Sequence, residues 1–167
     1  MSRQKGTVLV TGANGGLGSA IVSRIISDPD LRIYHGIYTV RNTKSCSQLD
    51  TALRSTLGEQ ENIHSHEKIS LDLSSLRSVR EAATVINARV TDGVIPPIKA
   101  IILNAGYEES EKQHWTVDGL DMTFTVNYLG QWLLTLLLLQ SMDRTTGRIV
   151  WISSWAQKQV PVRRPYH

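Results

Sequence analysis

The residues of this 167-residue chain that could do chemistry begin with a glycine-rich segment, Thr11–Gly18, which reads TGANGGLG. It stands between a short β-branched run and a segment with apolar residues at helical spacing. Backbone without side chains can approach a pyrophosphate closely, and a helix N-terminus behind it offers N–H groups and a positive dipole end. The segment predicts a nucleotide-phosphate turn, with an ordinary glycine-rich strand–helix connection as the alternative.

A cation stands at the next position where such a nucleotide would be contacted. The expected second strand, Ile33–Val40, ends in Arg41 and Asn42 with no acid, and Lys44 follows. An acid there hydrogen-bonds the ribose 2′-hydroxyl of NAD, whereas an arginine suits the 2′-phosphate of NADP because its charge is permanent and its bonding bidentate. We therefore predict NADP(H) as the cofactor, with a solvated loop arginine as the alternative.

The elements that must position these residues alternate between strand-like and helix-like apolar periods. Strands are expected at Thr7–Thr11, Ile33–Val40, Lys68–Leu73, Ala100–Asn104 and Arg148–Ser153. Helices are expected near 18–27, 45–57, 76–86 and 120–142. This alternation predicts an α/β, Rossmann-type, doubly wound parallel sheet of five strands in the order 3-2-1-4-5. Its ligand crevice is expected at the carboxyl ends of the first and fourth strands.

Composition narrows the classes of function. A hydrophobic fraction of 41%, a charged fraction of 20% and a net charge of +3 indicate one globular domain over residues 1–167 and no nucleic-acid partner. With Cys46 as the only cysteine, neither an internal disulfide nor a cysteine-based zinc site is expected, and no metal is assigned. The apolar stretch Trp132–Leu139 is shorter than the ~20 residues that span a bilayer. No signal sequence is seen, so we expect a cytoplasmic protein without a membrane partner.

Five segments in register resemble the short-chain dehydrogenase/reductase family: TGxxxGxG at 11–18, Asp72-Leu73, Asn104-Ala105-Gly106, the Asn127 motif at 126–130, and RIVWISS ending at Ser154. The resemblance implies that Asp72 contacts the adenine ring and that Asn104–Gly106 line the crevice. Thr116–Leu120 looks most like the branch of retinol dehydrogenases, protochlorophyllide reductases and related fungal dehydrogenases. The cofactor-binding residues so predicted are Thr11, Gly12, Asn14, Gly16, Leu17, Gly18, Arg41, Asp72, Leu73, Asn104, Ala105 and Gly106.

The resemblance also implies a reaction, which is hydride transfer between nicotinamide and a ketone or secondary alcohol. Ser154 would hold the substrate oxygen, and Asn127 would take part in the proton relay. In the family a Tyr moves the proton, with a Lys four residues later whose charge stabilises the phenolate. No Tyr-x-x-x-Lys follows Ser154, and Tyr166 has no Lys after it. We therefore expect an incomplete family domain that lacks the C-terminal strands and helices. The resemblance implies that the protein is an NADP-dependent oxidoreductase. The alternative is a catalytically dead nucleotide-binding pseudoenzyme or partner subunit.

The remaining patterns carry less specific expectations. The leucine-rich helix 120–142 is apolar almost all round and RIVWIS forms a sheet edge, so we expect a homodimer through the helix or poor solubility. His64 and His66 are expected in a solvated loop. His35 and His114 have no carboxylate partner that the sequence places, and Glu108, Glu109 and Glu111 are expected to form a solvated acidic loop.

Overall fold

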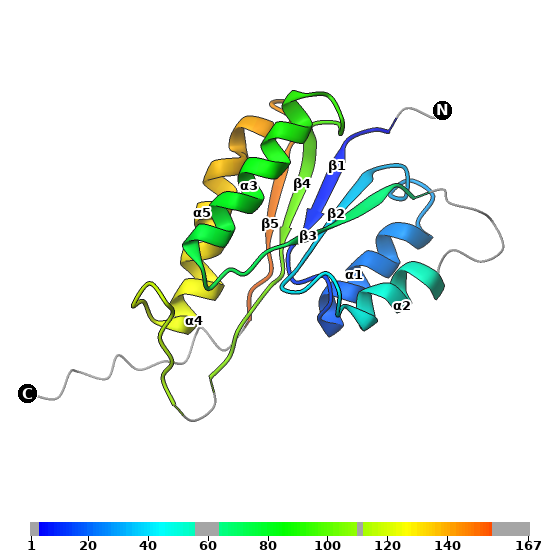
Figure 1. Cartoon of the computed structure of the whole chain (residues 1–167). Helices are drawn as coiled ribbons and strands as arrows, with labels where there is room; N and C mark the ends of the chain where they lie inside the picture. Colours follow the sequence, from blue (N-terminus) through cyan, green and yellow to red (C-terminus); the bar gives the residue numbers. More distant parts are fainter. Residues whose placement is uncertain (1–3, 56–63, 110–111, 155–167) are drawn as a thin grey trace, which may run out of the picture.

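A parallel sheet between two layers of helices organises the computed structural model, which describes residues 4–55, 64–109 and 112–154 (Figure 1). The strands are β1 Thr7–Val10, β2 His35–Val40, β3 His66–Ser70, β4 Ile98–Leu103 and β5 Arg148–Trp151. The helices are α1 Gly16–Ser27, α2 Ser47–Ser55, α3 Leu76–Thr91, α4 Met122–Phe124 and α5 Gly130–Leu138. The strand order is β3-β2-β1-β4-β5 with every pair parallel, which confirms the predicted topology.

Each face of the sheet has its own core, and the alternation of side chains along the strands builds both. Leu9 and Ile37 face the layer of α3 and α5, whereas Val8, Val10 and Tyr38 face α1 and α2. All four residues of β1 are buried, because both faces of this central strand are covered. That double burial explains why β1 reads as an uninterrupted apolar run in the sequence.

Among the strands, the boundaries differ most at β3, which was expected at Lys68–Leu73 and is found at His66–Ser70. The strand begins earlier because His66 pairs with Gly36 of β2. It ends earlier because the Asp72 carboxylate accepts a hydrogen bond from the Ser74 amide at 2.9 Å, which starts the turn into α3. The predicted C-terminal end of the second helix, at Leu57, lies outside the described residues.

One continuous helical run extends from Met122 to Ser141, close to the predicted 120–142. It consists of α4, a π-helical turn at Thr125–Leu129, α5 and a 3₁₀ turn at Leu139–Ser141. Among the described helices, this run alone has the length and apolar composition to cross a membrane, with a mean hydropathy of 1.3. Its side chains Leu134 and Leu138 are fully buried in the core shared with α3, as expected for a core helix of a globular domain.

Candidate functional site

A cleft of about 680 Å³ lies at the carboxyl ends of the strands, above the paired ends of β1 and β4. It collects the loops that follow β1, β2, β3 and β4. The predicted residues that line it are Gly12, Asn14, Leu17, Gly18, Arg41, Asp72, Leu73, Asn104, Ala105 and Gly106. Thr11, Gly16, Asn127 and Ser154 do not line it.

The glycines of the turn after β1 serve two different purposes. Gly12 has φ +65°, and a β-carbon on it would lie 2.8 Å from the Cα of Ala105. A β-carbon on Gly18 would lie 2.2 Å from the carbonyl oxygen of Gly12. By contrast, one on Gly16 would meet nothing within 4 Å. Gly12 and Gly18 are therefore required by packing, whereas Gly16 leaves open space at the start of α1.

The first turn of α1 keeps its amides available. The N-cap residue is Gly15, and no side chain caps this helix end. The one amide side chain of the turn, Asn14, accepts hydrogen bonds from the backbone N–H groups of Gln48 and Leu49, both at 3.1 Å. Asn14 therefore ties the turn to the start of α2, and it leaves the first turn of α1 facing the cleft without a capping side chain.

Thr11 forms the floor beneath the cleft. Its side chain is fully buried, and its hydroxyl accepts hydrogen bonds from the backbone N–H groups of Asn104 (2.9 Å) and Ala105 (3.0 Å). The Asn104 side-chain amide donates back to the Thr11 carbonyl at 3.0 Å. These bonds clamp the ends of β1 and β4 together, so Thr11 shapes the cleft from below.

Gln131, which the sequence analysis did not single out, completes this clamp from α5. It is 1% exposed; its Oε1 accepts from the Thr11 hydroxyl at 3.0 Å and its Nε2 donates to the Ala105 carbonyl at 2.7 Å. The helix can come this close because Gly130 has no side chain, and a β-carbon there would lie 2.4 Å from the Leu73 carbonyl oxygen. A Gly-Gln pair inside a leucine-rich helix is the sequence pattern that could have indicated this close polar contact.

Charge at the cleft comes from one cation and one acid among the described lining residues. Arg41 is exposed at the end of β2, and no ion pair engages its guanidinium within residues 4–55, 64–109 and 112–154. Its backbone carbonyl accepts from the Ser70 hydroxyl at 3.2 Å. The acid, Asp72, accepts from the Ser74 hydroxyl at 2.7 Å and so is held in the turn before α3.

Asn127 and Ser154, the predicted catalytic residues, lie beside the cleft on separate elements. Asn127 is in the π-helical turn, and its side chain holds the loop after β4 by donating to the Tyr107 carbonyl (2.8 Å) and accepting from the Tyr107 amide (2.7 Å). Ser154 is exposed and follows β5, whose pairing with β4 continues to a hydrogen bond from the Ile152 amide to Leu103. Tyr166 lies outside the described residues.

The expectation of a solvated loop was wrong for His64 and for His66, which is the first residue of β3. The fold also gives His35 and His114 the carboxylate neighbours that the sequence did not place. His35 lies 3.2 Å from the Glu67 carboxylate of the neighbouring strand, and His114 lies 3.4 Å from that of Glu109. His64 is 5% exposed and packs against β2, so it does not lie in a solvated loop. The partners come from segments apart in the sequence or from the folding back of a loop, which spacing alone does not reveal. Glu111 lies outside the described residues.

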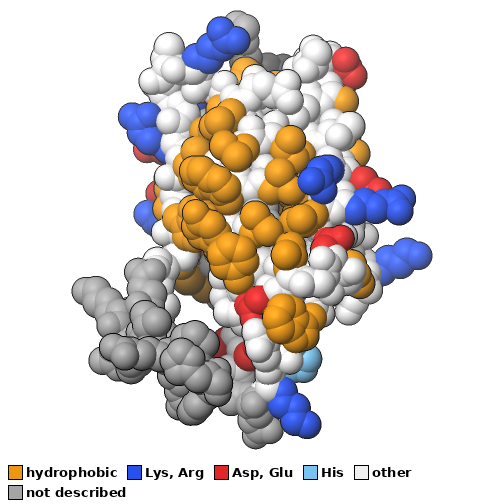
Figure 2. Space-filling view, turned by 90° about the vertical axis from the view of Figure 1, so that its left-hand side faces the viewer, with side chains coloured by type: hydrophobic (Ala, Val, Ile, Leu, Met, Phe, Trp, Pro, Cys, Tyr) orange, Lys and Arg blue, Asp and Glu red, His pale blue; other side chains and the backbone are white. Residues whose placement is uncertain are grey.

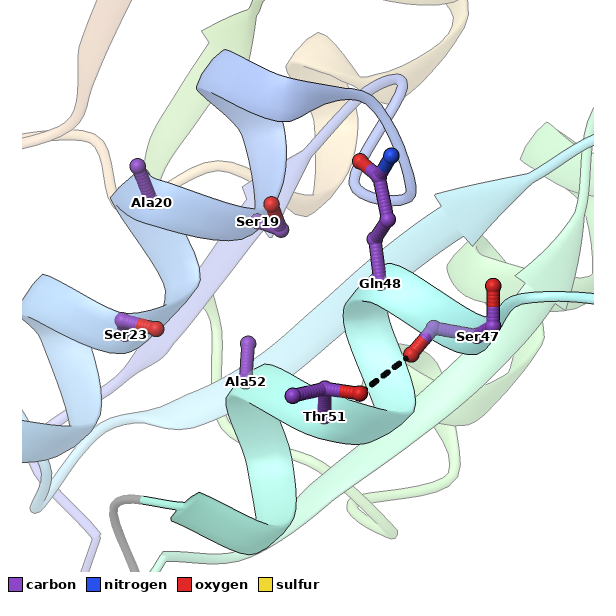
Figure 3. Close-up of a pocket in the computed structure, with 7 residues that line it drawn as sticks. All are labelled: Ser19, Ala20, Ser23, Ser47, Gln48, Thr51 and Ala52. Atoms are coloured by element: carbon purple, nitrogen blue, oxygen red, sulfur yellow. Dashed lines mark hydrogen bonds between the residues drawn. The ribbon is translucent and has the colours of Figure 1, made fainter.

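A second hollow of about 400 Å³ lies between α1 and α2, away from the predicted residues (Figure 3). It is lined by Ser19, Ala20, Ser23, Ser47, Gln48, Thr51 and Ala52. None of these side chains is charged, and the Thr51 hydroxyl donates within α2 to the Ser47 carbonyl at 2.9 Å. The cleft at the strand ends is therefore the better candidate for a functional site.

The chain is similar to short chain dehydrogenases in both sequence and fold. The sequence profile of the short chain dehydrogenases matches residues 6–167. A short-chain dehydrogenase, iccH, from Talaromyces variabilis is 55% identical over 93% of this chain and 42% of its own length. Human retinol dehydrogenase 13 is 36% identical over 90% of this chain and 41% of its own length. The structure of a metagenomic short-chain oxidoreductase in complex with NADP shares the fold, with a TM-score of 0.71 at 23% identity over 93% of this chain and 65% of that one. The chain thus spans about two fifths of the length of these curated relatives.

Proposed function

The chain belongs to the short-chain dehydrogenase family, and on that premise we propose that its cleft binds NADP(H) as the nucleotide-binding part of an oxidoreductase. The observation that carries the choice of NADP(H) is Arg41, an exposed cation at the end of β2 without an ion-pair partner in the described part of the chain. No acid occupies the β2 end, where it would repel a 2′-phosphate.

The cleft has the features that this cofactor requires. The uncapped N-terminus of α1 faces it, and Gly16 leaves room there for a pyrophosphate. Arg41 would pair with the 2′-phosphate, Asp72 would meet the adenine, and the segment Asn104–Gly106 would line the path toward the nicotinamide. When bound, the nicotinamide supplies or accepts a hydride. The buried Thr11 clamp fixes the spacing of these loops before any ligand arrives.

Titration with NADPH and NADH, followed by tryptophan fluorescence or calorimetry, tests the choice of cofactor. Arg41→Ala removes a charge-assisted contact of ~1.5–3 kcal/mol. NADPH affinity should therefore fall roughly 10- to 100-fold, and NADH affinity should stay unchanged. Arg77→Ala is the matched control, because Arg77 is exposed on α3 and pairs with Glu81 outside the cleft. Equal binding of the two cofactors by the unaltered protein, or no loss in Arg41→Ala, would overturn the proposal.

For the reaction we propose reduction of a ketone or oxidation of a secondary alcohol, with Ser154 holding the substrate oxygen and Asn127 in the proton relay. The second candidate is a nucleotide-binding pseudoenzyme or partner subunit. NADPH oxidation measured with a panel of ketones separates the two. Turnover that is abolished by Ser154→Ala supports an enzyme, and tight NADPH binding without turnover supports a pseudoenzyme.

We also propose that a second copy covers the hydrophobic area formed by α4, α5 and β5. Figure 2 shows it as a broad apolar surface on the side where α5 and β5 lie. Tyr128 joins its two parts, since its ring centroid lies 5.4 Å from that of Phe124 and 6.0 Å from that of Trp151. The exposed members, here called the apolar face, are Phe124, Tyr128, Trp132, Leu136, Leu139, Ile149 and Trp151. A patch of this kind is normally covered. A monodisperse monomer at micromolar concentration in sedimentation would contradict it.

A further inference from the structure

Two of the chain's histidines are buried on opposite faces of the β2–β3 pair, at the edge of the sheet farthest from β5. On the α1–α2 face, His64 Nε2 lies 2.7 Å from the Tyr38 hydroxyl and its Nδ1 lies 3.0 Å from the Arg32 carbonyl oxygen. The His66 ring stacks on His64 with centroids 5.7 Å apart. Both nitrogens of His64 are therefore used inside the protein.

The hydrogen bonds fix the protonation state of His64. A carbonyl only accepts, so Nδ1 carries the hydrogen and Nε2 must accept from the phenol of Tyr38. If His64 gained a proton, Nε2 would become a donor facing another donor. The phenol could then accept, but its own hydrogen would be left without a partner at a side chain that is fully buried. Protonation therefore breaks a satisfied contact.

The charges around His64 do not offset this cost. The charges of His66 from β3 and His35 from β2 oppose a charge on His64, and Lys68 further along β3 is paired with Asp50 of α2. Burial lowers the pKa of His64, and the hydrogen bond to Arg32 opposes the shift without cancelling it. Burial likewise raises the pKa of Tyr38 far above its usual range, so the phenol stays neutral.

His35, on the α3 face, shows the opposite arrangement. Its ring nitrogens face the Ser65 hydroxyl at 2.8 Å and the Glu67 carboxylate at 3.2 Å, and both partners can accept a hydrogen bond. Glu67 also lies 3.1 Å from Arg89 of α3. Burial lowers the pKa of His35, and the hydrogen bond to Glu67 opposes that shift without cancelling it. An imidazolium is therefore better tolerated at His35 than at His64.

We propose that the His64–Tyr38 contact is an acid-sensitive latch, and that protonation of His64 releases the edge strand β3 from β2 while the rest of the sheet stays folded. β3 depends on this latch because it packs chiefly on β2 and none of its five residues is fully buried. Released β3 would carry Leu71–Leu73 away from the cleft, so acidification also removes one wall of the site. The latch itself does not rest on the proposed cofactor.

Native-state amide exchange of the free protein at pH 7.5, 6.5 and 5.5, corrected for intrinsic rates, tests the latch. An opened strand takes up the proton near the ordinary histidine pKa of about 6.5, whereas latched His64 resists it. The opening equilibrium of residues 66–70 should therefore rise about tenfold per pH unit below 6.5, until the folded pKa of His64 is reached. Residues 7–10 of β1 should keep their protection over this range.

His64→Gln should reduce this pH dependence to the part that His35 contributes through Ser65 and Glu67, and His114→Gln, at an exposed site, should leave it unchanged. A ring-nitrogen NMR titration of the unaltered protein supplies a second measurement if His64→Gln fails to fold. It should show the Nδ1–H tautomer and a pKa below 6.5. The latch is refuted if His64 titrates at or above that value, if His64→Gln keeps the full dependence, or if β1 and β3 lose protection together. None of these readings requires bound NADPH.

Discussion

The two edges of the sheet are built in contrasting ways. At the β3 edge, buried polar groups such as His64 and Tyr38 are paired with each other or with backbone. At the β5 edge, all four strand residues are exposed, and Ile149 and Val150 are each 44% exposed. Between them, the clamp around Thr11 joins β1 to β4. The β3 side of the sheet, here called the nucleotide side for its proposed role, therefore pairs these buried polar groups within the described residues, whereas the side that carries Ser154 presents an uncovered apolar surface.

On the proposed function, this difference separates the part that would bind the cofactor from the part that would react. The cleft takes its shape from backbone approaches at Gly12 and Gly18 and from bonds that close within the chain. Changes on the nucleotide side should therefore cost folding stability, and changes on the apolar face should alter association. Three substitutions test that division, from the largest expected effect to the smallest.

Gly18→Ala should give the largest loss of folding stability. Its β-carbon would meet the Gly12 carbonyl oxygen at 2.2 Å and the Ala13 Cα at 2.9 Å, so backbone has to move. We expect the free energy of unfolding, measured in urea, to decrease by about 3 kcal/mol. Gly16→Ala is the matched control, because its β-carbon meets nothing. Stability should stay the same or rise slightly in that variant, while NADPH affinity falls. Equal stability losses in both would show that the turn's glycines are not divided as described.

Gln131→Leu should have an intermediate effect. It leaves the Thr11 hydroxyl and the Ala105 carbonyl without their buried partner, a cost of about 2 kcal/mol. The free energy of unfolding in urea measures it, with Gln140→Leu on the exposed end of the same helical run as the control. If both variants are as stable as the unaltered chain, the clamp does not need α5, and the nucleotide side is less integrated than the contacts indicate.

Leu136→Glu should change stability least. Leu136 is 48% exposed, so the free energy of unfolding of the monomer should change by less than about 0.5 kcal/mol. Its charge would nevertheless lie in the centre of the apolar face, and sedimentation velocity should show the protein shifting toward monomer. Arg80→Glu, on exposed α3, should leave association unchanged. A large loss of stability in Leu136→Glu would mean that this surface is part of the core.

Much of this architecture could be predicted from the sequence. Alternating apolar runs gave the parallel sheet and its order, because a strand covered on both faces, such as Thr7–Val10, leaves an unmistakable β-branched run. The glycine spacing at Gly12 and Gly18 correctly indicated that the cleft lies at the carboxyl ends of the strands. The assignment of cofactor and catalytic roles to these residues stays a prediction.

What escaped prediction depends on contacts between distant segments. The sequence shows Gln131 as one polar residue in an apolar helix, and only the fold brings it to Thr11, 120 positions earlier. His64 was assigned to a loop because nothing in its local sequence indicates that Tyr38 lies opposite. Helix and strand periods report which face is buried, but they do not report which polar groups meet there.

The π-helical turn at Thr125–Leu129 contains a consequence for sequence change along this helix. Such a turn amounts to one extra residue in a regular helix. Deleting a single residue there would give a regular α-helix. It would also rotate the part of the helix before the deletion by roughly 100° relative to the part after it. Asn127 and Gln131 could then no longer both meet their partners. The π-helical turn therefore sets the rotation of one half of the helix relative to the other. Insertions or deletions should be tolerated more readily after Ser141 than inside the helical run.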